Sequence, residues 1–212
     1  MGHVFMNNRG GGSSKNYIKN GLVAFFDGRD APVGGKWIDK VQGLEATLNS
    51  VTYDSVNKRY NFPQGAYAPL PANITVGQNY TVELVLGTQH QALNEQGGII
   101  EDLGQGQWLY TLNNNRIDVQ GSGYIAPAYS NNAPRQIAIS KMQNAQHRAY
   151  VAGREVVLTS ASSANTNRLF GVIGSMNSGR RRPLQIHAIR IYNRELTSEE
   201  LVKNAIADMN NY

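Results

Sequence analysis

Short apolar segments separated by turn residues recur along the chain from Gly21 onward. Many of them alternate as half-buried strands do; Val82, Leu84 and Leu86, for example, share one face. Gly153 lies between two such segments and predicts a tight hairpin with a positive φ. The clearest predicted strands are residues 22–26, 80–86, 97–101, 107–112, 116–119, 136–141, 147–151, 155–158, 169–173 and 184–192. Because no helical pattern separates them, the sequence predicts an all-β antiparallel sandwich.

One short helix is predicted at the C-terminal end. Thr197 and Glu200 have the spacing of a capping box, with Thr197 at the N-cap and Glu200 at position N3. Apolar residues then recur at helical spacing. They predict one buried stripe, made of Leu201, Val202, Ala205, Ile206 and Met209.

Residues 1–17 are predicted to form a flexible arm ahead of a single domain of residues 18–212. Three glycines and two serines at positions 10–14 favour flexibility. A short apolar plug precedes them, made of Val4, Phe5 and Met6. Two interpretations of the plug stay open: a disordered terminus, or a peg that becomes ordered on another subunit.

Composition and charge narrow the function classes. The 212 residues include no cysteine, which excludes disulfides, thiol catalysis and Cys-ligated zinc. The net charge of +5 is the difference between 20 basic and 15 acidic residues, and the basic residues are thinly spread, so nucleic-acid binding is not indicated. No apolar stretch approaches the ~20 residues that span a bilayer, and we expect no membrane contact. The N-terminus has no apolar core of a secretory signal, so we expect synthesis in the cytoplasm.

The closing segment, residues 186–204, runs from a strand with Arg190 and Tyr192 into the capped helix. It resembles the end of laminin-G-like domains, which belong to the concanavalin-A-like lectin/glucanase superfamily. Residues 21–28 and 37–39 are similar to the opening strands of that family. The resemblance covers about residues 18–212 and implies a jelly-roll sandwich of two antiparallel sheets. In such a sandwich we expect Arg190 to tie its strand to a neighbouring turn.

No catalytic carboxylate pair is evident. Retaining glycosidases place two carboxyl groups about 5 Å apart. Glu83 is followed by no second acid in its strand, and Glu101 and Asp102 point to opposite faces because they are adjacent. The four histidines are scattered without metal-ligand spacing. We therefore expect that the protein is not an enzyme and has no catalytic residue.

The resemblance also implies a calcium site, because laminin-G-like domains often hold calcium through Asp side chains and carbonyl oxygens. The candidates are Asp27, Asp30 and Asp39, which lie near two turns. Calcium takes six or more oxygen ligands, and these residues offer three carboxylates. Ordinary capping of turns by Asp is the alternative. We expect no cofactor, with calcium as the one exception to test.

Aromatic and amide side chains suggest a glycan-binding surface. Trp108 and Tyr110 share a strand face, and a Gly/Ser/Asn-rich loop follows. The glycan-binding candidates are Trp108, Tyr110, Tyr124, Tyr129 and Asn131. The alternative is that Trp108 and Tyr110 are core aromatics of the sandwich.

A dense basic cluster follows a turn just before the last predicted strand. It consists of Arg180, Arg181 and Arg182. These arginines are either a solvated turn or a contact with an anion or another subunit.

Context then favours one function. A sandwich with no export signal, no cysteine and a glycine-linked apolar arm fits a phage virion protein that decorates a capsid, a head fibre or a tail. We expect such a protein to be oligomeric in the assembly, to contact other virion proteins through the arm and to bind host-surface glycans. A carbohydrate-binding module of a secreted bacterial protein is the alternative, and a glycoside hydrolase is the third interpretation.

Overall fold

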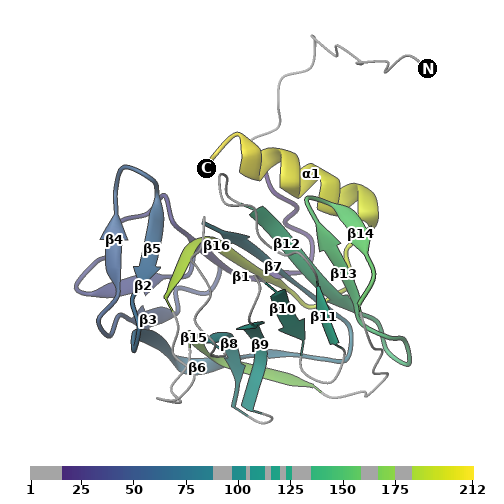
Figure 1. The fold of residues 1–212 in the computed structure, drawn as a ribbon, viewed down its shortest axis with the longest axis horizontal. Coiled ribbons are helices and arrows are strands. Elements are labelled where there is room, and N and C mark those ends of the chain that lie inside the picture. The colour runs from purple at the N-terminus through teal and green to yellow at the C-terminus, as the bar shows by residue number, and fades with distance from the viewer. Residues whose placement is uncertain are drawn as a thin grey trace.

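The fold is given by a computed structural model that describes residues 16–87, 97–103, 106–112, 116–119, 123–125, 135–158, 167–174 and 183–212. These residues form sixteen strands and one helix (Figure 1). The strands are β1 (Leu22–Asp27), β2 (Lys36–Ile38), β3 (Glu45–Thr47), β4 (Thr52–Asp54), β5 (Arg59–Phe62), β6 (Tyr67–Val76), β7 (Tyr80–Leu86), β8 (Gly97–Asp102), β9 (Gly106–Leu112), β10 (Arg116–Val119), β11 (Gly123–Ile125), β12 (Arg135–Lys141), β13 (Arg148–Val151), β14 (Arg154–Val156), β15 (Arg168–Gly174) and β16 (Leu184–Tyr192). The helix is α1 (Ser198–Met209).

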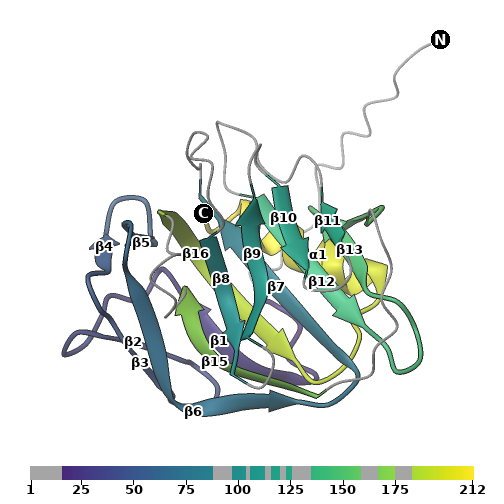
Figure 2. The ribbon, with the colours of Figure 1, turned by 60° about the horizontal axis from the view of Figure 1, so that its bottom comes forward.

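Two antiparallel sheets pack face to face, which confirms the predicted all-β sandwich. The larger sheet has the order β14-β13-β12-β7-β16-β5-β4, with β1 also paired to β16. The smaller one has the order β11-β10-β9-β8-β15-β6, and β2 pairs with β3 beside them. Figure 2 shows the smaller sheet curving across the larger one. The strand predictions are therefore confirmed to within a residue or two in most cases.

The core lies between the inner faces of the two sheets. Strand β7 contributes Val82, Leu84 and Leu86, as its alternation predicts. From the smaller sheet, Trp108 packs against Phe170 with ring centroids 4.9 Å apart. Burial of these apolar side chains is the main contribution that stabilises such a domain.

Helix α1 adds a third layer on the outer face of the larger sheet, next to β12 and β14 (Figure 1). The capping box at Thr197 and Glu200 is confirmed. Only Leu201 and Ala205 of the five predicted stripe residues are buried, because Val202, Ile206 and Met209 are 40%, 43% and 74% exposed. The face that packs on the sheet consists of Leu201, Asn204, Ala205, Ala207 and Asp208. The polar Asp208 belongs to this packed face because the buried Arg190 of β16 lies opposite it and donates to its carboxylate.

Tyr17, the last residue of the predicted arm, packs on the domain. Residues 1–15, with Val4, Phe5 and Met6, lie outside the described residues. Tyr17, which the sequence assigns to the arm, is 8% exposed and packs edge-on against Phe25 at 5.2 Å. The backbone N–H of Ile18 donates to Asn204 of α1 at 2.9 Å. The packed domain therefore includes Tyr17.

In the part of the chain that the structure describes, no helix is long and apolar enough to cross a membrane.

Candidate binding pocket

Of the residues predicted to bind glycans, the structure describes the side chain of Trp108. Trp108 is 0% exposed in the core, so it offers no platform to a sugar, and that prediction is wrong. Tyr110 and Tyr124 lie on strands β9 and β11, both opposite Asp118 of β10, in one row across the sheet. Tyr129 and Asn131 lie outside the described residues. So do the predicted assembly contacts Arg180, Arg181 and Arg182.

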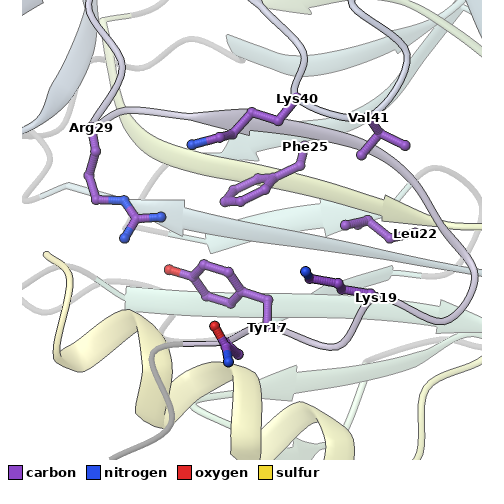
Figure 3. Close-up of a pocket in the computed structure, with 8 residues that line it drawn as sticks. Tyr17, Lys19, Leu22, Phe25, Arg29, Lys40 and Val41 are labelled. Carbon is purple, nitrogen blue, oxygen red and sulfur yellow. The ribbon is translucent and has the colours of Figure 1, made fainter.

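A cavity of about 540 Å³ opens instead on the outer face of the larger sheet. This volume lies within the range of small-molecule sites. Figure 3 shows side chains from three segments pointing toward one another: the segment before β1, β1 with the turn after it, and the turn after β2. The lining residues are Asn16, Tyr17, Lys19, Leu22, Phe25, Arg29, Lys40 and Val41.

Strand alternation places the floor of the pocket. In β1, Phe26 points into the core, so its neighbour Phe25 points to the outer face. The N–H of Phe25 donates to the Asp39 carboxylate at 2.5 Å, and the N–H of Lys40 donates to the Phe25 carbonyl at 2.9 Å. The Asp39 carboxylate also accepts from the N–H groups of the next turn, Val41 among them. Asp39 therefore holds the turn that carries Lys40 and Val41 against β1.

Asp27 fixes the two cations on one side of the pocket. Its carboxylate is 0% exposed and accepts from Arg29 Nε at 2.9 Å, Arg29 Nη2 at 2.5 Å and Lys40 Nζ at 3.1 Å. The Tyr212 hydroxyl donates to it as well, at 2.7 Å. Burial alone would raise the pKa of Asp27, but the hydrogen bonds, chiefly from Arg29, outweigh it and hold the pKa at about 2. Asp27 is therefore charged at neutral pH.

Tyr17 forms the side of the pocket opposite these two cations. Its hydroxyl accepts from Asn211 Nδ2 at 2.8 Å, and the Oδ1 of the same Asn211 accepts from Arg29 Nη1 at 2.8 Å. Behind the ring, the Arg190 guanidinium lies 4.2 Å from the centroid, a favourable cation–π distance. Burial raises the pKa of Tyr17 to about 12, so the hydroxyl stays protonated.

The arrangement combines an apolar floor with a cationic rim. Phe25, Tyr17 and Leu22 provide the floor, and Lys19, Arg29 and Lys40 provide charged donors. Among the described lining residues none is acidic. The pocket suits a small polar molecule that has one apolar face.

Asp27, Asp30 and Asp39 do not converge on a common point. Asp27 and Asp30 pair with Lys40, at 3.1 and 2.9 Å, and Asp39 caps its turn. Within the described residues no group of three or more His, Asp or Glu side chains is arranged to hold a metal ion. Asp39 thus caps a turn, the role that stood as the alternative to calcium, whereas Asp27 and Asp30 form ion pairs with Lys40.

The sandwich is similar to parts of several solved structures. A sialidase of Trypanosoma rangeli in complex with sialic acid matches it with a TM-score of 0.68 at 14% identity, over 89% of this chain and 33% of that chain. A mutant of HCR/D matches with a TM-score of 0.66 at 15% identity, over 90% of this chain and 52% of that chain. This chain thus spans about a third of the sialidases and half of HCR/D, and the likeness shows a shared fold. No protein-family model and no curated protein matches the sequence.

These comparisons overturn the prediction that the chain is not an enzyme. The solved structures that share its fold include enzymes, the sialidases. The prediction rested on the missing pair of carboxylates, and sialidases are an exception among glycosidases because they use a tyrosine nucleophile. A search for paired acids is therefore not a test for this kind of catalysis.

Proposed function

We propose that this chain is a carbohydrate-binding domain and that the pocket of Tyr17, Phe25, Arg29 and Lys40 holds the sugar. The observation that carries the proposal is the pocket itself, an apolar floor surrounded by fixed hydrogen-bond donors. Sugars present C–H groups on one face and hydroxyls at the edge, so an aromatic floor and charged donors complement both.

Two further points support the proposal. The fold is shared with a sialidase whose structure holds sialic acid. The resemblance of residues 186–204 to laminin-G-like domains of the lectin/glucanase superfamily implies a lectin-like sandwich as well.

A pair of matched substitutions tests the site. Val41→Trp would fill the mouth of the pocket, where Val41 lies 44% exposed. Val56→Trp makes the same change at an 85% exposed position that does not line the pocket. We expect sugars identified on a glycan array to lose binding in the first variant and keep it in the second. Equal binding by both variants, or no sugar bound by the unmodified chain, would contradict the proposal.

The virion role also stays a proposal. Its expected contacts, the apolar plug at 4–6 and the basic cluster at 180–182, lie outside the described residues. Mass spectrometry of purified particles and of the surrounding lysate tests it: the chain should be enriched in the particles.

A further inference from the structure

We infer that the sugar bound in this pocket carries a carboxylate, which lies between Lys19, Arg29 and Lys40. The inference rests on the proposed sugar binding and names the class of sugar. It follows from where the charges lie, how Arg29 is held and what the rest of the lining provides.

The charged groups that line the cavity are cations, and none of the described lining residues is acidic. Lys40 is exposed and Arg29 half-buried, and both line the cavity. Two carboxylates balance them. Asp27 pairs with both cations and is fully buried, and the half-buried Asp30 pairs with Lys40 at 2.9 Å; neither lines the cavity. Lys19 adds a third, exposed cation at the rim. An incoming ligand therefore meets positive charge first, and an anionic group is favoured there.

Arg29 is preorganised to bind a planar anion. Asp27 accepts from its Nε and Nη2, and Asn211 accepts from its Nη1. A guanidinium carries five N–H donors, so in the described structure one donor on each terminal nitrogen is left for a ligand. Because the group is already held in place, a carboxylate would bind it with little loss of side-chain entropy.

The remaining surface fits a sugar ring rather than a small free anion. Leu22, Phe25 and Val41 present apolar surface next to the cations, and the cavity of about 540 Å³ is far larger than a carboxylate needs. A ring that packs on this surface and directs its carboxylate to Arg29 uses both halves of the pocket.

The test compares glucuronate with glucuronamide, which keeps the ring and replaces the charged group by a neutral amide. We expect glucuronate to bind at least tenfold more tightly in isothermal titration, since a hydrogen bond to a charged group is worth about that factor. Lys19→Gln and Lys40→Gln should each lower the affinity for glucuronate several-fold, and by a larger factor than the affinity for glucuronamide. Lys203→Gln, the same change on an exposed position of α1, should affect neither. On the unmodified chain, raising the salt concentration should weaken only glucuronate binding.

The outcomes separate the inference from the proposal beneath it. Equal affinity for the acid and the amide, unaffected by salt or by the lysine variants, would overturn the carboxylate inference and leave sugar binding in place. If neither compound binds, and neutral sugars do not bind either, both fail.

Discussion

Arg190 of β16 and Asp208 of α1 form two parallel hydrogen bonds, 2.8 and 2.6 Å long, in a layer closed to solvent. The third N–H used by Arg190 donates to Glu83 of β7 at 2.8 Å. Glu83 also accepts from Asn204 and Gln136, at 2.8 and 2.7 Å, so its buried carboxylate is well supplied with donors. One guanidinium thus joins the helix to two central strands, and its flat face carries the Tyr17 ring that lines the pocket.

Removing this arginine should therefore cost far more than removing a surface one. Arg190→Met leaves Glu83 and Asp208 buried without their partner, and we expect a loss of about 3–5 kcal/mol in the free energy of unfolding. Arg194→Met is the control, because its pair with Glu200 is partly solvated and should be worth about 1 kcal/mol or less. Urea unfolding measures both variants. Similar losses in the two would contradict the role given to Arg190.

The stability of the domain should fall in mild acid because of His147. Its Nε2 lies 2.7 Å from the Tyr80 hydroxyl in the core, and burial, aided by Arg168 and Lys141, lowers the pKa of His147 from 6.5 to about 4. Between these pH values the unfolded chain takes up a proton that the folded chain does not. The contribution of His147 to the free energy of unfolding is therefore complete above pH 6.5 and is lost progressively as the pH falls toward 4. At pH 5 the loss should be about 2 kcal/mol.

Comparison with a variant isolates this effect. His147→Gln keeps a polar partner for Tyr80 and removes the titrating group. The difference in unfolding free energy between pH 7.5 and pH 5 should then be about 2 kcal/mol smaller than in the unmodified chain. An unchanged pH dependence would show that His147 is protonated in the folded state at pH 5.

The layers of the fold were predictable because each strand keeps its period. The alternation in residues 184–192 correctly placed Arg190 and Tyr192 on the face opposite Ile189 and Ile191. What this face meets was not predictable from the strand alone. The expected partner was a turn, whereas the structure places α1 there. The helix stripe was misassigned for the same reason, since Asp208 is buried only because Arg190 neutralises it.

Strand β6 was missed, although it is the longest strand at ten residues. Pro69 and Pro71 argue against a strand, since proline cannot donate to a ladder. β6 accommodates them because it lies at the edge of its sheet, where its other side carries, in the described residues, a single bridge between Tyr67 and Asn49. Edge position depends on the whole topology and cannot be read from ten residues.

The pocket gave even less signal in the sequence. Tyr17, Arg29 and Lys40 come from three segments, and no spacing links them. The sequence favours Trp108 as a sugar platform because tryptophan is common in sugar sites. In this sandwich the same ring fills the core, where it packs against Phe170 and Tyr80. Asp27 was noticed as a calcium candidate, and its actual role in holding Arg29 and Lys40 follows only from their meeting in space.

Gly153, in the hairpin under α1, should tolerate substitution poorly. It has a φ of +75°, and a Cβ atom there would lie 2.7 Å from the Cα of Val202. Gly43 has a similar φ of +72° with nothing within 4 Å. We expect Gly43→Ala to cost about 1 kcal/mol from backbone strain alone. Gly153→Ala should cost at least twice as much because the helix must shift. Equal losses in thermal unfolding would show that α1 is loosely packed on the hairpin.

Two truncations locate where the folded domain begins. Deleting residues 1–15 removes the glycine-rich segment and the apolar plug, and we expect the free energy of unfolding to stay unchanged. Deleting residues 1–18 also removes the buried Tyr17 ring and the hydrogen bond from Ile18 to Asn204. Loss of a buried aromatic side chain costs about 3–5 kcal/mol, so this second truncation should be severely destabilised.

Urea unfolding of both truncations, with the slope of the transition compared, distinguishes the alternatives. A shifted midpoint with an unchanged slope reports a true loss of stability. The shorter protein should also lose sugar binding, because Tyr17 lines the pocket, while the chain that begins at Asn16 should keep it. If deletion of residues 1–15 is already as costly as deletion of 1–18, the arm itself packs on the domain. The plug at 4–6 would then have its partner within the same chain, and the proposal that it docks on another subunit would fail.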